Sequence, residues 1–151
     1  PGSRDLLTSV LGHLTWRPGE CRFETSDNGQ IFIKLDQTEQ TIANRDVFVV
    51  CSRDDGESEI NFSVMRLLLL IDALRRESPY RLTVILPSLE YARQDRRLIA
   101  GEAIPPKLLL RLMHTSGADR FVVMDLHNDA EAAFSPAGCV LDEVSADQYL
   151  A

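Results

Sequence analysis

Several features that define common protein classes are missing from this 151-residue chain. No stretch approaches the roughly 20 consecutive apolar residues that a membrane-spanning helix needs. The three cysteines, Cys21, Cys51 and Cys139, are an odd number without paired spacing, which favours a reducing compartment over a disulfide framework. The net charge of −7 argues against non-specific nucleic-acid binding, because a phosphate backbone requires a basic surface. These absences predict a cytoplasmic protein that binds neither membrane nor nucleic acid.

The common glycine-rich nucleotide loops are missing as well. Neither GxxxxGK[ST] nor GxGxxG occurs, so a nucleotide site would have to be built from other residues. The first three residues, Pro-Gly-Ser, lack a signal-peptide pattern and are interpreted as a cloning remnant. With 44% hydrophobic and 26% charged residues, the composition is that of one soluble globular domain.

Hydrophobic periodicity predicts an α/β fold. Continuous apolar runs of the kind found in strands buried on both faces alternate with segments of helical spacing. The predicted strands are Val47–Cys51, Leu82–Leu86 and Phe121–Met124, and the predicted helices are Arg4–Leu14, Ile60–Arg76 and Pro105–Thr115, the last capped by Gly117. Residues 21–35 predict a hairpin, with a type I′ turn at Asn28-Gly29. A further helix is predicted from Val144 onward. The expected architecture is a doubly wound, mainly parallel sheet with an N-terminal β-hairpin.

In such sheets, ligands bind beyond the carboxyl ends of the strands. Three segments follow the predicted strands at that edge: Ser52–Ser58, Ser88–Arg97 and Asp125–Asp129. The candidate functional residues are therefore sought there.

The second of these segments contains a cluster of cationic side chains. Its sequence is Tyr-Ala-Arg-Gln-Asp-Arg-Arg at 91–97, with three arginines and one amide in five residues. Arginine binds phosphate through charge and through forked hydrogen bonds, so the cluster indicates a phosphate site. A solvated run of charge is the alternative interpretation.

The third segment begins with Asp125-Leu126-His127. Because strand side chains alternate, Asp125 and His127 should lie on one side, where they could hold a metal or a metal-bound phosphate. A simple hydrogen-bonded pair is the alternative, and a tight structural metal site would need more ligands. Asp129 and Glu131 could add carboxylates or could face solvent.

Taken together, these strings resemble one family. The stretches 71–76, 84–87, 91–97, 117–120 and 124–127 stand in the order and spacing of the ribose-phosphate pyrophosphokinases, or PRPP synthetases. The strings Tyr-Ala-Arg-Gln-Asp and Met-Asp-Leu-His are specific to that family. The resemblance covers nearly the whole of the chain, residues 1–151, but only the first of the family's two domains.

The resemblance implies a phosphoribosyltransferase-like fold and transfer of pyrophosphate from ATP to ribose 5-phosphate, with Mg²⁺ as the cofactor. It implies ATP binding by Arg93, Gln94 and Asp95, and a metal role for His127 supported by Asp125. It also implies that a hairpin turn, here Asn28, Gly29 and Gln30, reaches the adenine site of a neighbouring subunit in a homo-oligomer.

The chain departs from the family pattern at several positions. Ser26 replaces an aromatic residue and Gln30 an acidic residue of the hairpin, and Leu98 replaces an acidic residue of the ATP loop. The family's ribose-phosphate loop and catalytic loop occur nowhere, so no catalytic residue is assigned here and the chain alone is expected to make no PRPP. The alternatives are a non-catalytic regulatory subunit associated with a true synthetase, and a bare nucleotide-binding module.

Overall fold

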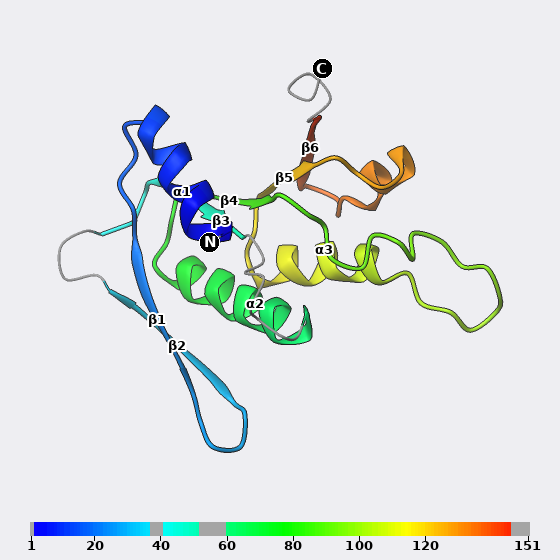
Figure 1. The fold of residues 1–151 in the computed structure, drawn as a ribbon, viewed down its shortest axis with the longest axis horizontal. Helices are drawn as coiled ribbons and strands as arrows, with labels where there is room; N and C mark the ends of the chain where they lie inside the picture. Colours follow the sequence, from blue (N-terminus) through cyan, green and yellow to red (C-terminus); the bar gives the residue numbers. More distant parts are fainter. Residues whose placement is uncertain (1, 37–40, 52–59, 146–151) are drawn as a thin grey trace.

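The computed structural model describes residues 2–36, 41–51 and 60–145 of the chain. In chain order, the elements are α1 (Gly2–His13), β1 (Glu20–Thr25), β2 (Ile31–Asp36), β3 (Asp46–Val50), α2 (Ile60–Arg76), β4 (Arg81–Leu86), α3 (Pro105–Ser116), β5 (Arg120–Met124), the 3₁₀ helix η1 (Asp129–Phe134) and β6 (Val140–Val144). Strands β3, β4, β5 and β6 form a parallel sheet in that order, and β1 and β2 form a separate antiparallel hairpin (Figure 1). The predicted α/β fold, with its parallel sheet and N-terminal hairpin, is confirmed.

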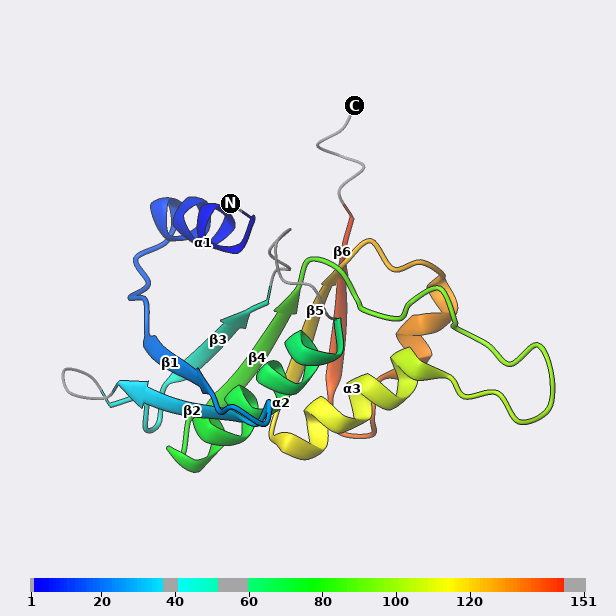
Figure 2. The same cartoon turned by 60° about the horizontal axis from the view of Figure 1, so that its bottom comes forward.

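The core lies between one face of the parallel sheet and two helices. Helices α2 and α3 contact each other and cover this face, as Figure 2 shows. Alternate strand residues point toward them, because side chains of a strand alternate between its two faces. The largest buried side chains on this face are Leu82, Val84, Phe121 and Val123, and they meet Ile71, Leu110 and Met113 from the helices. On the opposite face, the Trp16 ring after α1 stacks on Phe48 of β3, with ring centroids 4.1 Å apart.

The hairpin packs on α2 rather than on the parallel sheet. Strand β2 contacts α2, and the Arg66 guanidinium of α2 lies 4.2 Å above the Phe23 ring of β1. The turn differs from the predicted type I′. Gly29 has a positive φ of 83°, but Asn28 does not, and the Gly29 N–H donates to the Ser26 carbonyl oxygen at 2.9 Å. A three-residue loop with one left-handed glycine therefore replaces the two-residue loop.

The C-terminal part of the described chain corrects a second prediction. Val144, predicted to begin a helix, is the last residue of β6, and residues 146–151 lie outside the described part. Strand β6 carries Asp142, Glu143 and the partly exposed Val140 and Val144, so its apolar run is too short to mark a buried strand. Parallel pairing with β5 supplies the backbone hydrogen bonds of β6, although the sequence pattern of β6 does not predict a strand.

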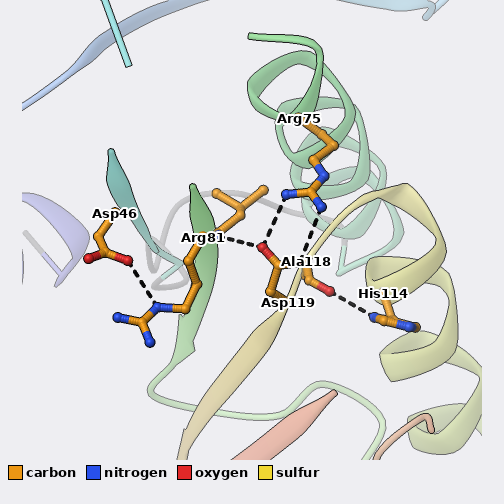
Figure 3. A network of polar contacts seen from close by, with 7 residues as sticks. Asp46, Arg75, Arg81, His114, Ala118 and Asp119 are labelled. Atoms are coloured by element: carbon orange, nitrogen blue, oxygen red, sulfur yellow. Dashed lines mark hydrogen bonds and ion pairs between the residues drawn. The ribbon is translucent and has the colours of Figure 1, made fainter. Parts of the chain in front are cut away.

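A polar network fixes the corner between α3 and β5 (Figure 3). Gly117 ends α3 with φ of 127°, and its N–H donates to the carbonyl oxygens of His114 and Met113, which confirms the predicted cap. Asp119 then accepts hydrogen bonds from the Arg75 guanidinium at 3.1 and 3.3 Å and from the backbone N–H of Leu82 at 2.8 Å. This single carboxylate joins α2, β4 and β5.

Candidate functional site

The candidate site is built at the carboxyl edge of the parallel sheet. The loop after β4 carries Arg93, Gln94 and Asp95, and the turn after β5 carries Asp125 and His127. Strands β4 and β5 are parallel neighbours, so both segments leave the sheet at the same edge (Figure 2). The third expected segment, Ser52–Ser58, lies outside the described residues.

Backbone strain occurs in both of these segments. Tyr91 has φ of 64° and Asp125 has φ of 46°, in the left-handed region that non-glycine residues rarely occupy. The Tyr91 hydroxyl donates a hydrogen bond to Asn61 Oδ1 at the start of α2. The Asp125 N–H donates to the Val144 carbonyl oxygen at 3.1 Å. Strain held in place by such contacts is common at ligand sites, because the surrounding structure has to impose it.

The loop between β4 and α3, residues 87–104, is called the arginine loop below. It presents its cationic groups to solvent. Arg93 and Gln94 are exposed, and the Gln94 N–H donates to the Tyr91 carbonyl oxygen at 3.1 Å. The Asp95 side chain turns inward and is only 13% exposed, whereas that of Arg96 is 75% exposed. The Arg96 Nε lies 3.9 Å from Asp95 Oδ1. The loop therefore directs Arg93 and Gln94 outward, while the hydroxyl of Tyr91 ties it to α2 and the Asp95 side chain lies on its inner side.

The tip of the same loop is ordered by Glu102. Its Oε2 accepts the N–H groups of Leu98 at 2.7 Å and Ile99 at 3.0 Å, and these bonds lower the pKa of the Glu102 carboxyl. Leu98 is 77% exposed and extends into solvent at this tip.

A cavity of about 210 Å³ lies beside the start of this loop, between α2 and α3. Its wall is mainly apolar and includes Cys51, Ser63, Leu67 and Leu109, together with residues 86–90. Arg93 does not line this cavity. A charged phosphate is therefore expected on the exposed side of the loop and not in the cavity.

The turn after β5 is held by two glutamates. The Leu126 N–H donates to Glu143 Oε1 of β6 at 3.0 Å, and the His127 N–H donates to Glu131 Oε2 of η1 at 3.2 Å. His127 itself is exposed. The sequence left open whether Glu131 adds a carboxylate to the site or faces solvent, and the structure excludes the second possibility because its side chain is fully buried.

Burial is the main cause that raises the pKa of the Glu131 carboxyl, and the charge of Asp95 raises it further, while hydrogen bonds from the backbone amides of His127 and, to a lesser extent, Asn128 lower it. Asp95 thus lies near enough to act on Glu131, which places the arginine loop beside the turn after β5. The available sequence signal for Glu131 was the spacing Asn128-x-x-Glu131, which is that of a helix capping box.

The hairpin residues do not join this site within the chain. Asn28, Gly29 and Gln30 lie at the far end of the hairpin, well away from the loop that precedes α3 (Figure 1). Ser26 has a local role there, because its hydroxyl donates to Asn28 Oδ1 at 2.5 Å and accepts the Gln30 N–H at 3.1 Å. The expected contact of the hairpin with a neighbouring subunit stays a prediction.

The donor set suits a metal that arrives with a nucleotide. Among residues 2–36, 41–51 and 60–145, no group of three or more His, Cys, Asp or Glu side chains could hold a metal ion. Mg²⁺ in phosphate-binding sites is held by one or two carboxylates, with substrate phosphates and water completing its shell. The carboxylate of Asp125 fits that mode, and the exposed His127, a nitrogen donor, could lie beside such an ion. Two side chains are too few for a resident structural ion. No helix in the described part of the chain is long and apolar enough to cross a bilayer.

The fold and this edge define an α/β protein with a parallel sheet, an antiparallel hairpin and two polar segments beyond the strand ends. Residues 2–117 match the family described as the N-terminal domain of ribose phosphate pyrophosphokinase. The chain therefore belongs to the ribose-phosphate pyrophosphokinase family.

Individual relatives agree with this assignment. The chain is 35% identical over 126 residues to a ribose-phosphate pyrophosphokinase of Staphylococcus saprophyticus, a match that covers 83% of this chain and 37% of the relative. It is 39% identical over 116 residues to that of Fusobacterium nucleatum, covering 77% of this chain and 35% of the relative. The crystal structure of phosphoribosylpyrophosphate synthetase from Mycobacterium smegmatis is similar with a TM-score of 0.87 and 32% identity, over 99% of this chain and 48% of that one. The chain thus spans little more than a third of the length of these curated relatives.

Proposed function

We propose that this chain supplies the ATP-binding half of a ribose-phosphate diphosphokinase, an enzyme that transfers pyrophosphate from Mg-ATP to ribose 5-phosphate and releases AMP. The observation that carries the proposal is the meeting of two motifs at one sheet edge, the loop of Arg93, Gln94 and Asp95 and the turn of Asp125 and His127. Arginine and a metal are the groups that neutralise charge as a phosphoryl group moves.

Each residue has a distinct role in this proposal. Arg93 and Gln94 bind the triphosphate from the exposed side of their loop, and Asp95 faces its inner side. His127 and Asp125 hold the Mg²⁺ that accompanies the triphosphate. The bound ion would supply charge neutralisation and orientation of the phosphates.

The proposed protein acts in the cytoplasm as a homo-oligomer. The hairpin supports self-association, because its turn extends from the domain with Asn28, Gly29 and Gln30 exposed. These residues would complete the nucleotide site of a neighbouring subunit. The chain alone is proposed to be inactive, because the ribose 5-phosphate site of this family lies in its second domain.

Calorimetric titration of the purified chain with Mg-ATP tests the nucleotide site. Arg93→Ala removes a charge-assisted hydrogen bond worth about 1.5–3 kcal/mol, so binding should weaken about 10- to 100-fold. His127→Ala should weaken binding only when Mg²⁺ is present. Arg111→Ala, at an exposed position of α3, is the matched control and should leave binding unchanged.

A second assay separates an enzyme from a non-catalytic associated subunit. AMP release from Mg-ATP and ribose 5-phosphate is measured with a full-length protein that carries this domain. Release that Arg93→Ala abolishes supports the enzyme. Nucleotide binding without AMP release, together with binding to an active synthetase, would replace the proposal with the regulatory subunit.

A further inference from the structure

Glu131 is an unusual residue for its position. Its side chain is 0% exposed, although it lies in the short helix η1 beside the exposed His127. One carboxyl oxygen, Oε2, accepts the His127 N–H at 3.2 Å. The other, Oε1, is buried and has no hydrogen-bond partner within the part of the chain that the structure describes. Burial of an incompletely bonded carboxyl group costs free energy, which indicates that Glu131 has a specific role at this position.

The local geometry is a modified helix cap. Asn128 is the N-cap residue of η1, and its Oδ1 accepts the Ala130 N–H at 2.9 Å. Three residues later, Glu131 reaches back, as the acidic residue of a capping box does. In a standard capping box this residue binds the amide of the N-cap itself. Glu131 binds the amide one residue earlier, that of His127, at 3.2 Å, and the N-cap amide of Asn128 makes a weaker contribution that also lowers the pKa of the Glu131 carboxyl. The buried carboxyl thus holds the backbone of the residue that carries the exposed imidazole.

We propose that Glu131 is the positioning residue of His127, fixing its backbone so that the imidazole faces the metal-bound triphosphate. This inference rests on the proposed function, because it assigns His127 to the nucleotide-bound metal. The physical reason is preorganisation: a ligand on a short exposed turn loses conformational freedom on binding, and a buried anchor removes part of that loss beforehand. Asp95 acts on the same carboxyl group, so the anchor also borders the arginine loop.

Three variants of the chain separate positioning from helix capping. Glu131→Met has a similar length and lacks the acceptor, whereas Glu131→Gln retains an oxygen that can accept the His127 N–H. Asn128→Ala is the matched control, because it removes the other half of the cap and leaves the His127 amide bond in place. Mg-ATP affinity is measured by calorimetry, and the His127 backbone and imidazole signals are recorded by NMR without nucleotide.

Removal of a partner that orients a metal ligand typically costs about 10- to 100-fold in affinity. We expect Glu131→Met to weaken Mg-ATP binding by at least about 10-fold and to shift both His127 signals. Glu131→Gln and Asn128→Ala should stay within about 2-fold of the original chain and leave the imidazole signal in place.

Three results would overturn the inference. If Glu131→Met and Asn128→Ala lose equal Mg-ATP affinity, Glu131 acts only by capping η1. If Glu131→Met and Glu131→Gln lose equal affinity, the charge of Glu131 and not its bond to the His127 amide is responsible. If Glu131→Met does not fold, hydrogen exchange of the His127 amide in the unaltered chain tests the bond to Glu131. An amide that is not protected from exchange would refute the bond and with it the inference. A chain that binds no Mg-ATP while its His127 signals respond as expected would refute the proposed nucleotide site and leave the anchor standing.

Discussion

Asp119 offers a quantitative test of how the corner between α3 and β5, at the sheet edge opposite the site, is held. Its carboxylate accepts two hydrogen bonds from Arg75 and one from the backbone N–H of Leu82 (Figure 3). The ion pair is partly solvated, with side chains 43% and 34% exposed, so it contributes only about 0.2–1 kcal/mol. The Leu82 amide is part-buried, and leaving it unpaired costs about 1–3 kcal/mol. The backbone bond should therefore dominate.

Asp119→Ala removes all three bonds and should lower the free energy of unfolding by about 1–4 kcal/mol. Two matched variants remove only the ion pair. Asp119→Asn keeps an oxygen for the Leu82 amide, and Arg75→Met keeps the aliphatic stem that lies against Gly117. Each should cost about 0.2–1 kcal/mol. At this chain length, a loss of 1 kcal/mol corresponds to roughly 2–4 °C in Tm.

Urea unfolding followed by circular dichroism measures these differences, provided that the slope with denaturant stays constant among the variants. The reasoning is refuted if Asp119→Ala costs no more than Asp119→Asn and Arg75→Met. That result would mean that the Leu82 amide finds water or another acceptor, and that the corner is held by packing alone.

Three further outcomes are expected. Gly117→Ala should destabilise the fold by about 1–3 kcal/mol or more, since φ is 127° and a Cβ would approach Arg75 Cγ to 2.6 Å; unchanged urea unfolding would contradict this. Tyr91→Phe should cost about 0.5–1.5 kcal/mol by losing the bond to Asn61, and Asn61→Ala should then add little; full additivity in a double-mutant cycle would argue against the contact. Burial raises the pKa of the Cys139 thiol to about 11, so it stays protonated at pH 8; mass spectrometry should find it alkylated by iodoacetamide more slowly than a free cysteine, and rapid labelling of the folded chain would oppose this.

Much of the scaffold followed from local pattern. The continuous apolar runs at β3, β4 and β5 and the helical spacing of α2 and α3 predicted those elements to within about one residue. Pro105 and Gly117 marked the ends of α3 through their own backbone preferences. The two polar motifs stood out because they follow buried strands at the carboxyl edge of the predicted sheet, where ligands bind in such folds.

The parts that failed depend on hydrogen-bond partners that hydrophobic periodicity and residue preferences do not reveal. Strand β6 has a weak pattern and forms because the edge of β5 offers backbone hydrogen bonds. Asn28 was assigned a positive φ from its pairing with glycine, but Ser26 organises the turn through its hydroxyl and carbonyl groups and needs only Gly29 in the left-handed region.

The sequence by itself determined the family, the alternation of strands and helices, and the residue types available to bind a phosphate and a metal. Those properties are encoded in short strings and in periodicity. Only the tertiary structure decided that Glu131 is buried against the His127 amide, that Asp95 turns inward while Arg93 faces solvent, and that Asp119 ties three elements together. Burial and hydrogen bonding are set by neighbours that the chain brings together only when it folds, so no local pattern could have fixed them.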